Sequence, residues 1–105
     1  MKVIKSIVLA AALMGAGGQV LAADQFVALP SYRVGPYGAG GSGFYGGMID
    51  YFNLVNANGG INGVKMTWEE CETEYNASRG VECYERMKTK NGGATLVDPL
   101  STGIA

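Results

Sequence analysis

The 105-residue sequence contains no histidine and only two cysteines, Cys71 and Cys83. Without histidine, the chain lacks the usual base that activates a serine or cysteine nucleophile, and it has no Gly-x-Ser-x-Gly elbow between a strand and a helix. The missing histidine and the wide spacing of the cysteines also disfavour a metal site. The sequence therefore predicts a protein that is not an enzyme and that holds no metal.

Long apolar runs are missing as well. The apolar residues 7–14 fall well short of the roughly 20 residues that span a bilayer, which argues against a membrane anchor. They follow Lys2 and Lys5 and precede Val20-Leu21-Ala22, which offers a cleavage site. This order is typical of a secretory signal peptide, so we expect residues 1–22 to be removed when the protein is exported.

The chain also has few positive charges. Once Lys2 and Lys5 are removed with the signal peptide, six of the eight basic residues remain against nine acidic ones, a net charge of −3. Nucleic acids and anionic membranes are bound by basic patches, and the sequence shows none. It therefore predicts no nucleic-acid partner.

Strand patterns alternate with helix patterns in residues 23–105. Short apolar runs predict strands at 25–29 (closed by Pro30), 64–69 and 94–97. Helical spacing predicts one helix that starts near Phe44 with Ser42 as N-cap, and a second one capped by Asn76 or Ser78. The side chains expected to face inward are Phe44, Met48, Tyr51, Phe52 and Val55 in the first helix, and Val81, Tyr84 and Met87 in the second.

This order predicts an α/β fold with a parallel, doubly wound sheet, because helices that join consecutive strands form right-handed crossovers. Ligands of such sheets bind beyond the carboxyl ends of the strands, where the strand order reverses. The segments expected at that edge are 31–43, 70–76 and 99–103. The acidic residues 69–74 are interpreted as a solvated exit loop.

Glycine is abundant at residues 31–47, which we interpret as a loop with φ > 0 that forms one wall of a ligand site. Residues 38–43 match the dinucleotide pattern G-x-G-x-x-G. They do not follow their strand directly, however, and no acidic residue stands where a ribose would need it. The pattern therefore does not predict a dinucleotide, and no cofactor is expected.

Two further pairs of residues leave alternatives open. Cys71 and Cys83 could lie within disulfide range, and an oxidising compartment favours a disulfide over two buried thiols. Ser101 and Thr102, with Gly103, stand where a strand leads into a helix, and their hydroxyl groups and free amides suit a carboxylate. The same residues could equally form an ordinary N-cap.

Several motifs resemble a known family. Residues 58–63 (Asn-Gly-Gly-Ile-Asn-Gly) before a strand, and Gly35-Pro36-Tyr37-Gly38, resemble the substrate-binding proteins of branched-chain amino acid (Leu/Ile/Val-type) ABC transporters, which are type I periplasmic binding proteins. Residues 68–72 (Trp-Glu-Glu-Cys-Glu) and 79–85 (Arg-Gly-Val-Glu-Cys-Tyr-Glu) resemble one branch of that group. The resemblance covers residues 25–105.

The resemblance implies a periplasmic, two-lobed protein that closes on a small ligand and delivers it to a membrane permease. It implies that Ser101 and Thr102 bind the ligand's carboxylate, that Tyr32 and Tyr37 contact its side chain, and that Arg33 is an extra carboxylate partner. Some relatives link the second-strand exit to the third-strand loop by a disulfide. The matching loop position here is Ser101, which leaves Cys83 as the partner of Cys71.

We therefore expect residues 23–105 to be an incomplete N-terminal lobe of a solute-binding protein for a branched-chain amino acid or a related amide-like molecule. A ligand-sensing domain of the same fold in a receptor or regulator is the alternative. An exported α/β enzyme is a third possibility, which would need a nucleophile elbow or a histidine outside this sequence.

Overall fold

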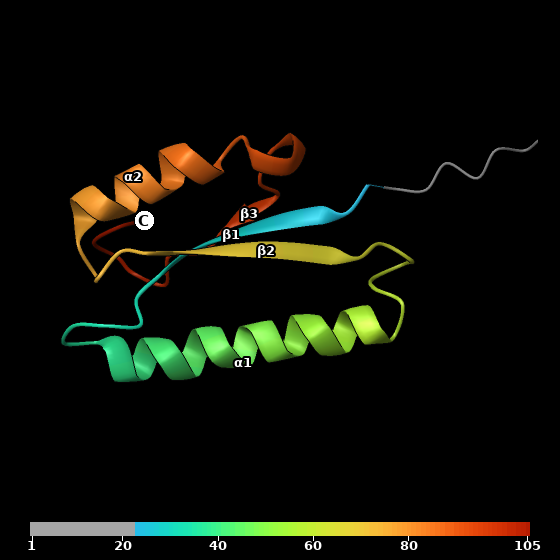
Figure 1. Cartoon of the computed structure of the whole chain (residues 1–105), viewed down its shortest axis with the longest axis horizontal. Helices are drawn as coiled ribbons and strands as arrows, with labels where there is room; N and C mark the ends of the chain where they lie inside the picture. Colours follow the sequence, from blue (N-terminus) through green and yellow to red (C-terminus); the bar gives the residue numbers. More distant parts are fainter. Residues whose placement is uncertain (1–22) are drawn as a thin grey trace, which may run out of the picture.

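The computed structural model describes residues 23–105, so the predicted signal peptide lies outside the described residues. Strands and helices alternate along the chain as predicted: β1 (Gln25–Ser31), α1 (Gly38–Ala57), β2 (Met66–Glu72), α2 (Ala77–Met87) and β3 (Leu96–Val97), with a short 3₁₀ helix at Lys90–Gly92 before β3. The strands form one parallel sheet in the order β2-β1-β3. Figure 1 shows α1 on one side of this sheet and α2 on the other, which confirms the doubly wound α/β fold.

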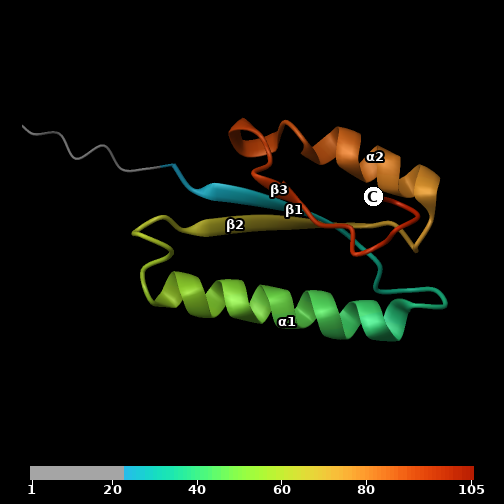
Figure 2. The ribbon, with the colours of Figure 1, turned by 180° about the vertical axis from the view of Figure 1, so that it is seen from behind.

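β1 is the centre of the fold because it is buried on both faces. On one face, Phe26 and Ala28 pack against Cys83 and Met87 of α2 and against Cys71 of β2. On the other face, Val27 and Leu29 pack against the α1 side chains Tyr45 and Phe52. The view from behind shows the same three layers, with the sheet between the helices (Figure 2).

β1 does not end before Pro30, as the sequence predicted, but continues to Ser31. The carbonyl groups of Phe26 and Ala28 accept hydrogen bonds on the β3 side, from the N–H groups of Thr95 and Asp98 at 2.8 and 3.0 Å. Pro30 lies on that same side of β1, beyond Ala28, where the pairing with β3 ends. Its missing N–H group therefore removes no hydrogen bond from the sheet.

β2 begins and ends later than predicted, and β3 is shorter. Residues 69–72 are part of β2, so the interpretation of 69–74 as an exit loop is wrong for most of that segment. β2 lies at the edge of the described sheet, where acidic side chains can reach cations beside it: Glu69 pairs with Lys90, and Glu70 pairs with Arg33. Charged side chains are a usual feature of edge strands.

The glycine-rich segment is mostly helix, so its interpretation as a loop up to residue 43, with Ser42 as N-cap, is wrong. α1 begins at Gly38, and Tyr37 is its N-cap. A Cβ atom added to Gly41 would lie 1.8 Å from the carbonyl oxygen of Tyr32, and one added to Gly38 would lie 2.7 Å from that of Arg33. These glycines are needed because the helix backbone packs directly against the chain that leaves β1.

This close contact also rotates the buried face of α1 relative to the prediction. Tyr45 and Phe52 are buried, whereas Phe44 and Tyr51, which were expected to face inward, are exposed. Residues 38, 41, 45 and 52 share the buried face because they follow the helical repeat from the glycines. α2 shows a similar rotation: Gly80, Cys83 and Met87 are buried, and Val81 and Tyr84 are exposed.

The predicted starts of α2 and of the turn after β3 agree with the structure. Asn76 caps α2, since its side-chain oxygen accepts a hydrogen bond from the Arg79 N–H group. After β3, a helical turn starts at Ser101, whose carbonyl group accepts a hydrogen bond from Ala105 at 2.9 Å. Within residues 23–105, neither helix has the length and apolar character that crossing a bilayer requires.

Candidate functional site

The segments that follow the three strands meet at one edge of the sheet, here called the carboxyl edge (residues 32–37, 73–76 and 98–105). The Tyr32 hydroxyl, just after β1, donates a hydrogen bond to the Leu100 carbonyl at 3.0 Å. The Thr73 hydroxyl, just after β2, donates one to the Ser31 carbonyl at 3.0 Å. The end of β1 and the residue after it therefore contact the segments after β2 and β3, as the position of the strand-order reversal predicts.

A shallow, open hollow of about 460 Å³ lies on this edge. Its lining residues come from the segments after β2 and β3: Tyr75, Asp98, Pro99, Leu100, Ser101, Thr102 and Ala105. Ser101 is only 8% exposed, and its hydroxyl oxygen has no hydrogen-bond partner among the described residues. Buried polar groups almost always have a partner, so this oxygen marks a place where a ligand group could complete the hydrogen bonding.

Leu100, which precedes Ser101, has an unusual backbone conformation. Its φ angle is +41°, in the left-handed region that a leucine side chain disfavours. Its N–H group donates to the Asp98 carboxylate at 3.2 Å, and its carbonyl group accepts from Tyr32. Both backbone groups of Leu100, the residue before Ser101, are therefore held by hydrogen bonds.

Four tyrosines form an aromatic cluster behind and beside the hollow. The Tyr32 ring contacts those of Tyr45 and Tyr75 edge-on, with centroids 5.6 and 5.0 Å apart, and Tyr75 also packs against Tyr37 at 4.5 Å. The Tyr45 hydroxyl lies 3.3 Å from the carbonyl oxygens of Pro30 and Asp98, and burial raises the pKa of this phenol. The cluster fixes the position of Tyr32, whereas Tyr37 is 56% exposed.

Charged side chains fix the chain that leaves β1. The Glu72 carboxylate accepts hydrogen bonds from the N–H groups of Arg33, Val34 and Glu74 at 2.6, 3.1 and 3.0 Å. The Arg33 guanidinium donates to both carboxylate oxygens of Glu70, at 2.8 and 3.1 Å, and this hydrogen bonding raises the pKa of Arg33. The Arg33 side chain thus has a partner within the fold and does not line the hollow.

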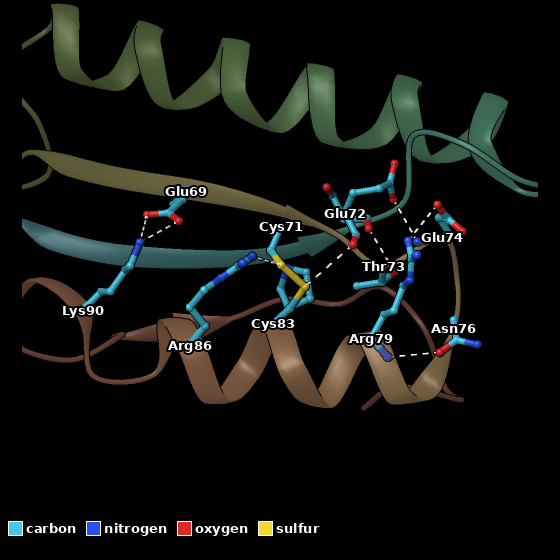
Figure 3. Close-up of a disulfide and its surroundings, with 12 residues drawn as sticks. Glu69, Cys71, Glu72, Thr73, Glu74, Asn76, Arg79, Cys83, Arg86 and Lys90 are labelled. Carbon is cyan, nitrogen blue, oxygen red and sulfur yellow. Dashed lines mark hydrogen bonds and ion pairs between the residues drawn. A yellow bond between two sulfur atoms is a disulfide. The ribbon is translucent and has the colours of Figure 1, made fainter.

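A disulfide between Cys71 and Cys83 holds α2 against β2, with the two Cα atoms 5.7 Å apart. Of the two possibilities left open by the sequence, the structure has the disulfide. Figure 3 shows this bond between the strand and the helix, with the Arg86 guanidinium directed at Cys71 and the Lys90–Glu69 ion pair nearby. Because Glu72, Thr73 and Tyr75 follow Cys71 closely, the disulfide limits the movement of one side of the carboxyl edge.

The structure brings some of the predicted ligand-binding residues together and separates others. Ser101 and Thr102 line the hollow, and a Cβ atom on Gly103 would lie 3.8 Å from the Ser101 hydroxyl oxygen. Tyr32 and Tyr37 do not line the hollow, but both contact the ring of Tyr75, which does.

Tyr75, Asp98 and Leu100 were not among the predicted site residues, although all three line the hollow. Their placement after β2 and β3 is the signal that could have indicated them, because the carboxyl ends of parallel strands share one edge. No cluster of three or more acidic or cysteine side chains suited to a metal is present in residues 23–105.

Comparisons with known proteins agree with the α/β fold described above. A family model described as "Periplasmic binding protein" matches residues 24–105. A crystal structure described as an ABC transporter permease from the Pseudomonas fluorescens group is 45% identical in sequence, with a TM-score of 0.71. The match covers 77% of this chain and 20% of the solved chain, so this chain spans only a small part of that protein. No curated protein matches the chain.

Proposed function

Because this chain belongs to the periplasmic binding protein family, we propose that it forms the first part of the N-terminal lobe of an exported solute-binding protein. The full-length protein, meaning the complete natural polypeptide that carries this sequence, would capture a small molecule between two lobes. It would then deliver the ligand to the permease of an ABC importer. The solved relative is named as part of an ABC transporter, which supports this partner.

The observation that carries the proposal is the buried Ser101 hydroxyl at the carboxyl edge, which has no hydrogen-bond partner within residues 23–105. A hydroxyl group can donate to a carboxylate oxygen, and a hydrogen bond to a charged group is stronger than one between neutral groups. Thr102 adds a second hydroxyl, and its N–H group, like that of Gly103, has no acceptor among the described backbone groups. We propose that Ser101, Thr102 and Gly103 bind the carboxylate of an amino acid.

The aromatic residues would form the wall that contacts the rest of the ligand. Tyr75 lines the hollow, and the exposed Tyr37 lies against it. Aromatic and aliphatic surfaces of this kind suit an apolar ligand side chain. We therefore propose a branched-chain amino acid, or a related amide-like solute, as the ligand.

Calorimetric titration of the full-length protein with leucine, isoleucine, valine and urea tests the ligand class. We expect saturable heat with at least one of these four compounds. Thr102→Ala should then weaken the binding of a carboxylate ligand by about 1–3 kcal/mol. The absence of heat with all four would remove the ligand assignment, and unchanged affinity in Thr102→Ala would make Thr102 an ordinary residue of the helical turn.

A further inference from the structure

We propose that Tyr32 is a positioning residue that acts together with Asp98. In this interpretation the two side chains hold Leu100 in its left-handed conformation, and this conformation places the Ser101 hydroxyl at the hollow. The inference rests on the proposed function only where it assigns Ser101 to the ligand. In this proposal Tyr32 does not contact the ligand, although the sequence predicted that it would, but positions Ser101, which does.

The distribution of left-handed residues sets the carboxyl edge apart. Asn62 and Asn91 have positive φ angles in turns, where asparagine is well tolerated. Glu74, Tyr75 and Leu100 also have positive φ angles, of 53°, 59° and 41°, and all three lie at the carboxyl edge. Residues in such conformations persist only where their surroundings hold them, and they gather at functional sites.

The contacts of Leu100 show what holds it. Its N–H group is bonded to the Asp98 carboxylate at 3.2 Å, and its carbonyl group is bonded to the Tyr32 hydroxyl at 3.0 Å. Leu100 is 43% exposed, so packing covers only part of this residue. The two hydrogen bonds restrain the backbone at both the N–H and the carbonyl group of the residue before Ser101.

Tyr32 is itself held firmly enough to act as such a support. It is 7% exposed, and its ring lies between those of Tyr45 and Tyr75. Gly41 packs so closely that an added Cβ atom would lie 2.5 Å from the Tyr32 ring. The hydroxyl is already bonded to Leu100, so the part of Tyr32 that could bind a ligand is used within the fold.

Hydrogen–deuterium exchange on the unliganded full-length protein tests the support directly. Tyr32→Phe keeps the ring and removes only the hydroxyl, and it should raise exchange about tenfold at the hydrogen-bonded amides of Leu100, Ile104 and Ala105, as expected for one lost hydrogen bond. Exchange in β1 should not change. Tyr51→Phe is the matched control, because Tyr51 is 62% exposed on α1, and it should leave both regions unchanged.

A second substitution tests whether the hydroxyl opposes strain at Leu100. Asparagine tolerates the left-handed region better than leucine does. Adding Leu100→Asn to Tyr32→Phe should therefore restore most of the lost protection at the amides of residues 104 and 105. Unchanged exchange in Tyr32→Phe, an equal increase throughout β1 and α1, or failure of Leu100→Asn to restore protection would each overturn the inference.

Binding of L-leucine provides a readout that a purely structural role would not change. Tyr32→Phe should weaken binding about tenfold in the normal protein but by less than about twofold when Ser101→Ala is also present, because the two residues act through one contact. Equal weakening in both backgrounds would make Tyr32 a separate ligand contact and would overturn the positioning role. If L-leucine does not bind at all, the proposed ligand fails while the exchange experiment still decides the role of Tyr32.

Discussion

The two edges of the sheet form their turns in different ways. At the amino edge (residues 58–65 and 88–95), every residue with a positive φ angle is glycine or asparagine. At the carboxyl edge, Glu74, Tyr75 and Leu100 adopt such angles, although their side chains disfavour them. The amino edge is thus made of relaxed turns, whereas the carboxyl edge is held in place by hydrogen bonds, aromatic packing and a disulfide. Because strained conformations gather at functional sites, this contrast supports assigning the proposed ligand site to the carboxyl edge.

The largest expected effect is at Gly41, where α1 contacts the chain that leaves β1. Gly41→Ala should destabilise the full-length protein by about 3–5 kcal/mol, because the added Cβ atom would lie 1.8 Å from the Tyr32 carbonyl oxygen. Gly40→Ala is the control, since nothing lies within 4 Å of its added Cβ atom. It should be neutral or stabilising by up to about 1 kcal/mol. Denaturant unfolding measures both, and equal effects would show that the contact is unimportant.

The disulfide should have the next largest effect. Replacing both Cys71 and Cys83 with alanine should cost about 3 kcal/mol, because the bond closes a loop between residues 12 positions apart. It should also increase proteolysis at residues 73–76, which follow Cys71, more than at the amino edge. Reductant should reproduce the loss of stability in the normal protein and should have no effect on the double variant. If proteolysis increased only at the amino edge, the disulfide would support that edge and not the carboxyl edge.

The contribution of Tyr45 to the aromatic cluster can be tested through the pH dependence of protein stability. Tyr45→Phe should cost about 1–2 kcal/mol near pH 8, because the buried hydroxyl lies within hydrogen-bonding distance of two carbonyl groups. Burial raises the pKa of Tyr45 in the folded protein, so its contribution is complete below the ordinary tyrosine pKa and is lost as the pH rises above about 10. The variant should therefore lose less stability than the normal protein between pH 9 and 11. Tyr51→Phe, at an exposed site, should show the normal alkaline loss.

The smallest expected effect is the relief of backbone strain by one substitution at each edge. Leu100→Asn should stabilise the folded protein by about 1 kcal/mol, because asparagine adopts a positive φ angle more readily than leucine. Asn91→Gly, at the amino edge, should change stability by less than about 0.5 kcal/mol, since asparagine already fits there. Thermal unfolding of the two variants gives the difference. Similar values would mean that Leu100 carries no more strain than an ordinary turn.

Much of the fold could be predicted because its signals are local. The alternation of strands and helices, the parallel sheet and the Asn-Gly turns of the amino edge depend on patterns within a few residues. The glycines of α1 were misinterpreted because their role is a tertiary contact: Gly38 and Gly41 are small where the helix meets β1, and only Gly35 in this segment has a positive φ angle. Sequence spacing alone cannot distinguish a glycine in a loop from a glycine at a close contact.

The candidate site could be located but not resolved in detail. The three segments of the carboxyl edge followed from the rule for parallel sheets, and Ser101 and Thr102 do line the hollow there. The strained conformation of Leu100 and the burial of Tyr32 depend on residues that are 68 positions apart, so no local pattern indicates them. The bond from Arg33 to Glu70, 37 positions away, was hidden from the sequence for the same reason.

Calorimetric titration of the full-length protein and its Ser101→Ala variant with L-leucine tests the central proposal most directly. If the buried Ser101 hydroxyl binds the ligand carboxylate, Ser101→Ala should weaken binding at least tenfold, while the exposed Ser78→Ala control on α2 should bind like the normal protein. Equal affinity for L-leucine in all three proteins would contradict the assignment of the carboxyl edge as the ligand site.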